Sequence, residues 1–310
     1  MIWTRRQQKS WELLASRLSF ECQRQTSRRS RQGFARSLAA QMASSSSCPT
    51  VSSKAAEVWE RLVGERSLGD LGLPVNKGRV DLRGLVAPRP TVVGRHVTES
   101  AEVTKLGGLI EIRGAHWKGI DFSGARLGSL RLLDSTIEDC SFEGARCQDW
   151  RMWGTTVVKT SFRSADLRQA ALGGVDNGKR NSFREVDFTK ADLRQTVYVS
   201  CDMIGCTFVD CKLSKVDFQG TVFVNCRFEG ELDEVLFYRQ AFRGEAFPGN
   251  EMKGVDLRRA KLRHVEFRGL NMSDVQCRRA TITSWLRTIL QNSIELWTCS
   301  RVKQMSLRKR

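Results

Sequence analysis

Ten cysteines and three histidines carry the most reactive side chains of this 310-residue chain. Paired cysteines can form disulfides or bind zinc, and a histidine beside a nucleophile or a carboxylate can act as a general base. No two cysteines form a C-x-x-C pair, and His96, His116 and His264 have no serine, cysteine or carboxylate at a recognised catalytic spacing. The chain also contains no P-loop and no H-E-x-x-H motif. We therefore expect a protein that is not an enzyme and that has no metal site and no cofactor.

Aspartate recurs at one kind of position, immediately before a large apolar residue. The six clearest cases are Asp121, Asp166, Asp187, Asp192, Asp217 and Asp256. A general acid would stand apart from the rest of the sequence, whereas these residues follow a pattern that runs along the chain. We therefore expect them to form hydrogen bonds at backbone corners.

The pattern behind these aspartates is a five-residue repeat. Counted in fives, the central residue of every quintet is apolar from Trp117 to Leu172, again from Phe183 to Phe228, and again from Phe237 to Ile282. A period of five fits neither the 3.6-residue helix nor the two-residue strand, but it fits a chain that turns a corner every five residues. Four such sides predict a square coil of 20 residues, with successive coils stacked about 4.8 Å apart.

A second period of 20 residues supports this geometry, because identical or similar side chains should stack along the axis of the coils. The sets with this spacing are Phe122, Phe142 and Phe162; Phe188, Phe208 and Phe228; Leu132, Met152 and Leu172; and Phe247 and Phe267.

The quintets A-D-L-R-Q, V-D-F-T-K and V-D-L-R-R resemble the pentapeptide-repeat family, whose consensus is A(D/N)LXX with leucine or phenylalanine at the centre. The resemblance covers roughly residues 117–282. It implies an all-β fold, a right-handed four-sided parallel β-helix with helical capping segments at both ends. Central residues and the small residues two positions earlier should point inward. Seven cysteines occupy such positions, so we expect buried reduced thiols, with Cys206 and Cys226 stacked on one face.

Departures from the repeat divide the chain into four segments. We predict a basic tail at 1–53, a capping helix and linker at 54–79, the β-helix at 80–284, and a helical cap with a basic tail at 285–310. The two capping helices are expected at Lys54–Leu71 and Trp285–Trp297, and the second could instead form a homodimer. Within the β-helix, residues 175–180 and 230–234 interrupt the register and should form irregular loops.

Residues 1–53 hold nine basic and two acidic residues and many serines. This composition is typical of a disordered tail, of an organelle transit peptide, or of an arm that binds nucleic acid. Met42 could serve as an internal start. We expect a soluble cytoplasmic protein, or a plastid or mitochondrial one if this segment is a transit peptide, because no apolar run approaches the ~18 residues that would span a membrane.

The net charge of +17 lies mainly at the ends of the chain. Residues 111–284 hold 27 basic and 24 acidic residues, so the predicted β-helix is nearly neutral. Some members of the resembled family mimic DNA and modulate type II topoisomerases such as gyrase, which requires a strongly acidic surface; this alternative is therefore disfavoured here. Nucleic-acid binding through the basic ends, without sequence specificity, is a weaker alternative. The candidate anion-binding residues are Arg258, Arg263, Arg268 and Arg278.

The favoured function is a non-catalytic rod or scaffold that binds a protein partner. Apolar residues at outward positions often mark partner sites, and tryptophan and tyrosine often anchor them. The candidate partner-binding residues are Leu133, Trp153, Ile204, Val224 and Tyr238. Leu133 and Trp153 form one pair 20 residues apart, and Ile204 and Val224 form a second.

Overall fold

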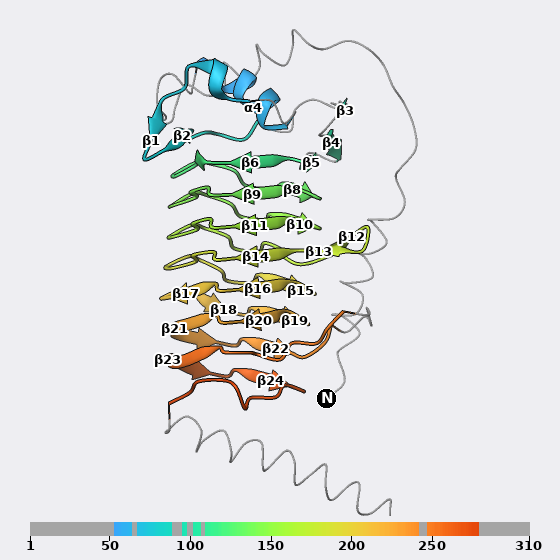
Figure 1. Ribbon diagram of the computed structural model, residues 1–310, viewed down its shortest axis with the longest axis vertical. Helices are drawn as coiled ribbons and strands as arrows, with labels where there is room; N and C mark the ends of the chain where they lie inside the picture. Colours follow the sequence, from blue (N-terminus) through green and yellow to red (C-terminus); the bar gives the residue numbers. More distant parts are fainter. Residues whose placement is uncertain are drawn as a thin grey trace, which may run out of the picture. The chain divides into compact units, whose positions relative to one another are not determined.

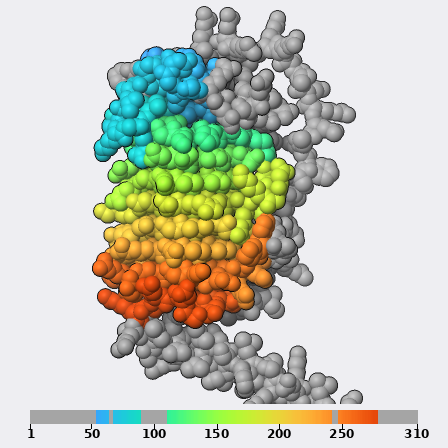
Figure 2. Space-filling view, viewed as in Figure 1, coloured from blue at the N-terminus to red at the C-terminus, as the bar shows by residue number. Residues whose placement is uncertain are grey.

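The protein is a stack of square coils, in which each side is a short strand or an extended segment (Figure 1). Coils follow one another in sequence order from the capping helix at one end to strand β24 at the other, so the colours of Figure 2 form successive bands. The computed structural model describes residues 53–63, 67–88, 95–97, 102–106, 109–241 and 247–278. The basic tail at 1–52 and the second predicted capping helix lie outside these residues.

The coil has four faces, which we number by the order in which the chain visits them. The first face carries β2 (Arg79–Asp81), β7 (Ile120–Asp121) and β17 (Thr207–Val209), and the second carries β18 (Leu213–Ser214). β21 (Arg227–Asp233) and β23 (Asp256–Arg263) run across both the first and the second face. The remaining coils contribute isolated parallel bridges to these two faces, such as Arg126 to Arg146.

The third and fourth faces are the more regular sheets. The third face holds β5 (Leu109–Arg113), β8 (Leu130–Leu133), β10 (Arg151–Trp153), β15 (Val197–Val199), β19 (Asp217–Gln219), β22 (Leu236–Tyr238) and β24 (Glu266–Arg268). The fourth face holds β6 (His116–Lys118), β9 (Thr136–Glu138), β11 (Thr156–Val158), β14 (Ser182–Arg184), β16 (Asp202–Ile204) and β20 (Val222–Val224). Within the fourth face all neighbouring strands are parallel.

Each corner requires a left-handed backbone residue two positions after the central residue. Asp134 (φ 44°), Ser164 (φ 54°) and Asp210 (φ 52°) occupy such corners, and glycine does so elsewhere, as at Gly144 (φ 64°). Small polar residues and glycine tolerate this conformation best. Between corners, the coils are joined by backbone hydrogen bonds such as Phe142 N to Ser161 O at 2.7 Å.

The interior is filled by the ladders that the 20-residue period predicts. On the first face, ring centroids of successive phenylalanines from Phe122 to Phe228 lie between 4.6 and 5.5 Å apart. All of these rings are fully buried. Since burying a phenylalanine contributes about 1.5–3 kcal/mol, the ladders are the main source of stability.

The inward small residues satisfy backbone carbonyls of the preceding coil. Thr155 Oγ1 donates to Leu132 O at 3.2 Å, and Cys226 Sγ lies 3.2 Å from Met203 O. A cysteine here has the same size and the same donor role as threonine. This explains the abundance of cysteine without invoking disulfide or metal chemistry.

Two predicted interruptions appear in the structure. The first is a hairpin of β12 (Val175–Asp176) and β13 (Lys179–Arg180) that projects from the corner between the third and fourth faces. At the second, one residue is missing between Phe228 and Leu232, so the corner is lost and β21 continues with a register shift.

At a third interruption the register predicted from the sequence is wrong. Phe267 was expected to stack on Phe247, but it stacks on Phe237 with ring centroids 4.9 Å apart. Among the described residues, the next one at an inward central position after Phe237 is Met252, which is fully buried. Residues 239–250 are therefore an insertion between the third and fourth faces. Phe247 lies in this insertion, with the Arg180 guanidinium 5.3 Å from its ring centroid.

The N-terminal end is capped as expected, although by a shorter helix than Lys54–Leu71. Helix α4 spans Ala55–Val63 and a 3-10 turn, η1, spans Gly69–Leu71. The Trp117 indole of the first regular coil donates a 2.9 Å hydrogen bond to Leu62 O, at the C-terminal end of α4. This cap covers apolar surface that an open coil would expose.

The predicted irregular first coil is also present. Leu82 and Leu85 are fully buried, and strand β1 (Val75–Asn76) forms an antiparallel hairpin with β2. On the third face, β3 (Arg95–Val97) and β4 (Glu102–Leu106) extend the sheet beyond β5 in antiparallel fashion.

Candidate functional site

The fourth face carries an apolar patch that we define as Ile204, Val222 and Val224. Ile204 and Val224 are register neighbours on β16 and β20, so the structure brings this predicted pair together. All three side chains point outward from the sheet and are half-buried. They lie on a regular parallel sheet, which gives the patch a rigid backbone.

Cationic residues lie on both sides of the patch along the same column. Arg184 is the register neighbour of Ile204 on one side, and Lys253 forms a bridge with Val224 on the other. Arg184 Nε donates to Ser182 Oγ at 3.2 Å, and no carboxylate among the described residues forms an ion pair with it. The distance from Arg184 to Lys253 is about 14 Å, since it spans three coil spacings of about 4.8 Å.

The other predicted apolar pair lies on the third face and is engaged by the hairpin. Leu133 and Trp153 are register neighbours, as predicted. A methyl group on Gly174 would lie 2.5 Å from Trp153 Cδ1, so the chain that enters the hairpin passes directly against this ring. Trp153 thus supports the hairpin backbone and is only half-exposed.

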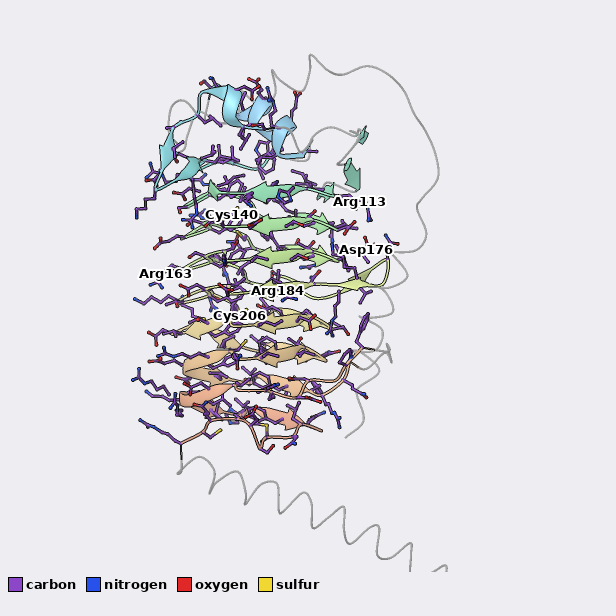
Figure 3. All side chains as sticks on the ribbon, viewed as in Figure 1. Arg113, Cys140, Arg163, Asp176, Arg184 and Cys206 are labelled. Atoms are coloured by element: carbon purple, nitrogen blue, oxygen red, sulfur yellow. The ribbon has the colours of Figure 1, made fainter. Side chains whose placement is uncertain are left out.

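Ion pairs hold this hairpin against the coils. Asp176 accepts from Arg113 at 2.6 Å, and Lys179 donates to Asp134 at 2.8 Å (Figure 3). Arg113 and Asp134 belong to earlier coils, so the predicted loop is an ordered hairpin held against the stack.

Tyr238 was expected to be an exposed apolar residue, and this expectation is wrong. The residue is only 8% exposed. The Arg268 guanidinium from the next coil lies 5.2 Å from its ring centroid, a cation–π arrangement.

The four candidate anion-binding arginines do not form one site. A five-residue spacing places successive residues on successive faces, so Arg258, Arg263 and Arg268 point in different directions. Each also has a carboxylate partner, which is Asp256 at 2.8 Å, Glu231 at 2.9 Å and Glu266, respectively. Only Arg278 shares a face with Arg258, because Gln276 is the register neighbour of Asp256.

The recurring aspartates form corner hydrogen bonds, as the sequence suggested. Where the quintet reads Asp-x-Arg the donor is that arginine, whereas Asp121 accepts from Ser123 and Asp187 from Thr189. In the Asp-x-Arg quintets, one aspartate oxygen accepts from both the backbone N and Nε of the arginine two residues later, and the other accepts from its NH2. The pairs are Asp81–Arg83, Asp166–Arg168, Asp192–Arg194 and Asp256–Arg258. This arrangement neutralises the carboxylates along the surface.

The Asp81 carboxyl gives a pH-dependent prediction. The side-chain hydrogen bond from Arg83 lowers its pKa below the ordinary value of 3.8. A lowered pKa in the folded state stabilises the fold above pH 4, and that contribution is lost as the pH falls through the folded-state pKa. We expect the Asp81→Asn variant to be less stable than wild type at pH 6 by about 1 kcal/mol or less, and to lose less stability on acidification to pH 3. Urea unfolding at both pH values measures this, and equal acid sensitivity of the two proteins would contradict it.

Burial holds most of the interior thiols in the protonated form. It raises the pKa of Cys140, Cys201 and Cys211 to about 12. The described cysteines are all free, and only Cys277 is half-exposed. The thiols of Cys140, Cys201 and Cys211 therefore stay protonated at neutral pH and are poor nucleophiles.

The described residues contain neither a cluster of metal ligands nor a helix that could span a membrane. In the part of the chain that the structure describes, no three histidine, cysteine or acidic side chains converge as metal ligands would. Within the same ranges, no helix has the length and apolar character to cross a membrane.

These features define the class of protein: a right-handed, four-sided parallel β-helix built from five-residue sides. A family model described as "Pentapeptide repeats" matches residues 200–230 and 251–284 with 8 copies. The chain therefore contains pentapeptide repeats over these residues.

Solved structures with a similar fold share little sequence with this chain. A pentapeptide repeat protein (Rfr23) from the cyanobacterium Cyanothece 51142 is 13% identical, with a TM-score of 0.35, over 38% of this chain and 91% of that one. HetL from Nostoc sp. strain PCC 7120, involved in heterocyst differentiation regulation, is 13% identical, with a TM-score of 0.29, over 71% and 93%. A protein of the Arabidopsis thaliana thylakoid lumen is 22% identical, with a TM-score of 0.19, over 37% and 66%. No curated protein sequence matches.

Proposed function

We propose that this protein is a non-catalytic scaffold that binds a protein partner through its fourth face. The observation that carries the proposal is the apolar patch of Ile204, Val222 and Val224, with Arg184 and Lys253 at its two ends. Apolar residues that point outward from a rigid sheet, with unpaired cations beside them, are typical of a recognition surface.

The geometry favours a partner segment with apolar side chains between acidic ones. The patch offers little depth, so affinity would come from desolvating its three side chains and from the two cations at its ends. Because the parallel sheet is preformed, binding would require little ordering of this chain. This holds equally in the cytoplasm and in an organelle.

The charge pattern of the surface fits a DNA mimic less well than a protein-binding scaffold. Its acidic surface would have to come from carboxylates such as Asp166, Asp192 and Asp256, and each of these forms an ion pair with an arginine.

Affinity capture with the Ile204→Asp variant tests the proposal. We expect proteins retained by the wild type to be lost, with at least a 10-fold loss of affinity once a partner is identified, because a carboxylate at the centre of the patch would have to be desolvated. Val209→Asp is the matched control, since Val209 is also a half-buried outward residue, but on the first face.

Mass spectrometry compares the proteins retained by the three baits, and circular dichroism checks that all three are folded. The same retained set for wild type and Ile204→Asp would exclude the patch. Loss with both variants would point to a different face or to a general effect on the fold.

A further inference from the structure

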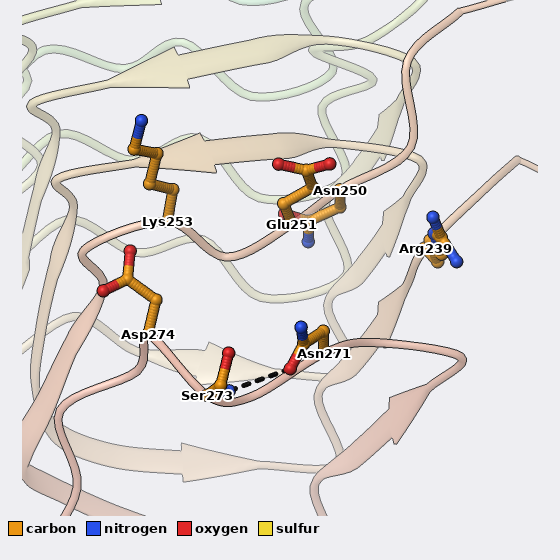
Figure 4. Close-up of a pocket in the computed structure, with 7 residues that line it drawn as sticks. All are labelled: Arg239, Asn250, Glu251, Lys253, Asn271, Ser273 and Asp274. Atoms are coloured by element: carbon orange, nitrogen blue, oxygen red, sulfur yellow. Dashed lines mark hydrogen bonds between the residues drawn. The ribbon is translucent and has the colours of Figure 1, made fainter.

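A polar hollow of about 450 Å³ opens where the sheet of the fourth face ends. β20 is the last strand of this sheet, and only a single bridge, Val224 to Lys253, joins it to the next coil. The insertion 239–250 precedes this coil, and its described residues, 239–241 and 247–250, form no strand. The hollow is lined by residues from both described ends of this insertion and from the coils that follow it (Figure 4).

Asn250 lines this hollow with an unpartnered donor. Its side-chain oxygen accepts from Phe223 N at 3.2 Å and from Met252 N at 2.9 Å, which fixes the orientation of the amide. The residue is only 1% exposed, and its Nδ2 has no hydrogen-bond partner among the described residues. Leaving a buried donor unpaired costs about 1–3 kcal/mol, so such a group indicates a missing acceptor.

Asn181 shows what a purely structural asparagine does in this fold. It follows the other insertion between the third and fourth faces, and its Nδ2 donates to Met152 O at 2.9 Å and to Leu172 O at 3.0 Å. Asn250 follows the insertion 239–250 in the same way, but its amide nitrogen has no such carbonyls. The unpaired donor is therefore specific to the hollow.

Two cations lie at the same hollow without ion-pair partners in the described chain. Arg239 packs its side chain against Gly249, where an added Cβ would lie 3.0 Å from Arg239 Cγ, so its stem is held in place. Lys253 is exposed at the opposite side. The neighbouring arginines on these coils, such as Arg227 and Arg258, do form ion pairs with carboxylates.

The hollow is lined by fewer free hydrogen-bond acceptors than free donors. Asp274 accepts from Gly254 N at 2.9 Å, and Asn271 accepts from Ser273 N at 3.0 Å. Glu251 is the one lining carboxylate for which the described residues supply no hydrogen bond or ion pair. Free donors therefore outnumber free acceptors.

We propose that this hollow binds an oxyanion, a carboxylate or a phosphate, through Arg239, Lys253 and the Asn250 amide. The guanidinium and the ammonium supply charge, and the fixed amide supplies a directed hydrogen bond. Glu251 opposes the bound charge and limits the affinity. The site shares Lys253 with one end of the proposed partner surface, but it contains none of the three apolar residues and its binding of an oxyanion does not depend on the proposed protein-binding function.

Titration of the full chain with inorganic phosphate, and separately with acetate, tests the inference at pH 7.5 and constant ionic strength. Backbone amide NMR shifts and calorimetry report binding. Asn250→Asp keeps the acceptor for Phe223 N and Met252 N but removes the donor and adds charge, so at least a 10-fold loss of affinity is expected. Arg239→Gln, at the exposed rim, should cause a similar loss without a risk to the fold.

The direction in which a third variant changes the affinity for the oxyanion is decisive. Glu251→Gln should tighten binding several-fold, whereas Arg263→Gln, an ion-paired arginine on the second face, should leave it unchanged. Tighter binding of phosphate than of acetate, or the reverse, identifies the oxyanion class. Absence of binding by both probes, or affinities that Asn250→Asp and Arg239→Gln leave unchanged, would overturn the proposal.

Discussion

Replacement of Phe208 by alanine is expected to lower the free energy of unfolding by about 3–5 kcal/mol. Phe208 is fully buried, and its ring stacks between Phe188 at 5.0 Å and Phe228 at 4.6 Å. The cavity cannot collapse easily, because the coils above and below are fixed to each other by backbone hydrogen bonds. Urea unfolding monitored by circular dichroism measures the loss.

Phe247→Ala is the matched control for this prediction. The spacing of 20 residues places Phe247 in a ladder with Phe267, but the structure places it in the insertion, half-exposed and beside Arg180. Its removal should cost about 1 kcal/mol or less, mostly from the cation–π contact. A loss as large as that of Phe208→Ala would show that Phe247 belongs to the ladder after all.

The repeat predicts most of the fold, because every quintet has the same pattern of side chains and forms the same local structure. An apolar centre, a small residue two positions earlier and a polar corner specify the same side of the coil wherever they occur. The stacks from Phe122 to Phe162 and from Phe188 to Phe228 follow directly from this spacing. The inward cysteines do as well, since their positions within the quintet decide their burial.

The register that the sequence predicts is wrong after Phe237, although the five-residue spacing of apolar residues continues there. Residues 237–252 keep an apolar residue at every fifth position, so nothing in the spacing marks the insertion. The structure differs because Phe237 and Phe267 are adjacent in space although they are 30 residues apart in sequence. A count of periods cannot detect an insertion whose length is a multiple of the period.

The wrong register also explains why the sequence does not predict the hollow and indicates a different set of arginines as anion-binding residues. Arg239 is the first residue of the insertion and Lys253 follows its end, and both line one hollow in the structure. Arg258, Arg263 and Arg268 follow a regular spacing that looks like a basic cluster in sequence, but the corners separate them. Composition identifies the charged residues, whereas the pairing of Arg263 with Glu231 of the preceding coil depends on how the coils stack.

The sequence predicts the surroundings of some candidate partner-binding residues but not of others. Ile204 and Val224 lie together on an open sheet, because spacing alone determines their register. Trp153 and Tyr238 also point outward, but neighbours from other coils contact them, Gly174 in one case and Arg268 in the other. Such contacts depend on insertions and long side chains that periodicity does not describe.

Gly173→Ala is expected to destabilise the protein by about 3 kcal/mol, because the added methyl group would collide with backbone. An ideal Cβ at Gly173 would lie 2.0 Å from Val199 N and 2.6 Å from Val199 O, and no side-chain rotation can relieve either contact. The coil would have to separate from the next one, which breaks ladder hydrogen bonds such as Leu172 N to Val197 O. Gly128→Ala is the matched control at the equivalent position of the second face, where the nearest atoms lie 3.7 Å away, and it should change stability by about 0.5 kcal/mol or less. Urea unfolding compares the two variants, and hydrogen exchange should show the loss of protection centred on β10, β15 and the hairpin. Similar stabilities for both variants would mean that the close approach at Gly173 is not a feature of the folded protein.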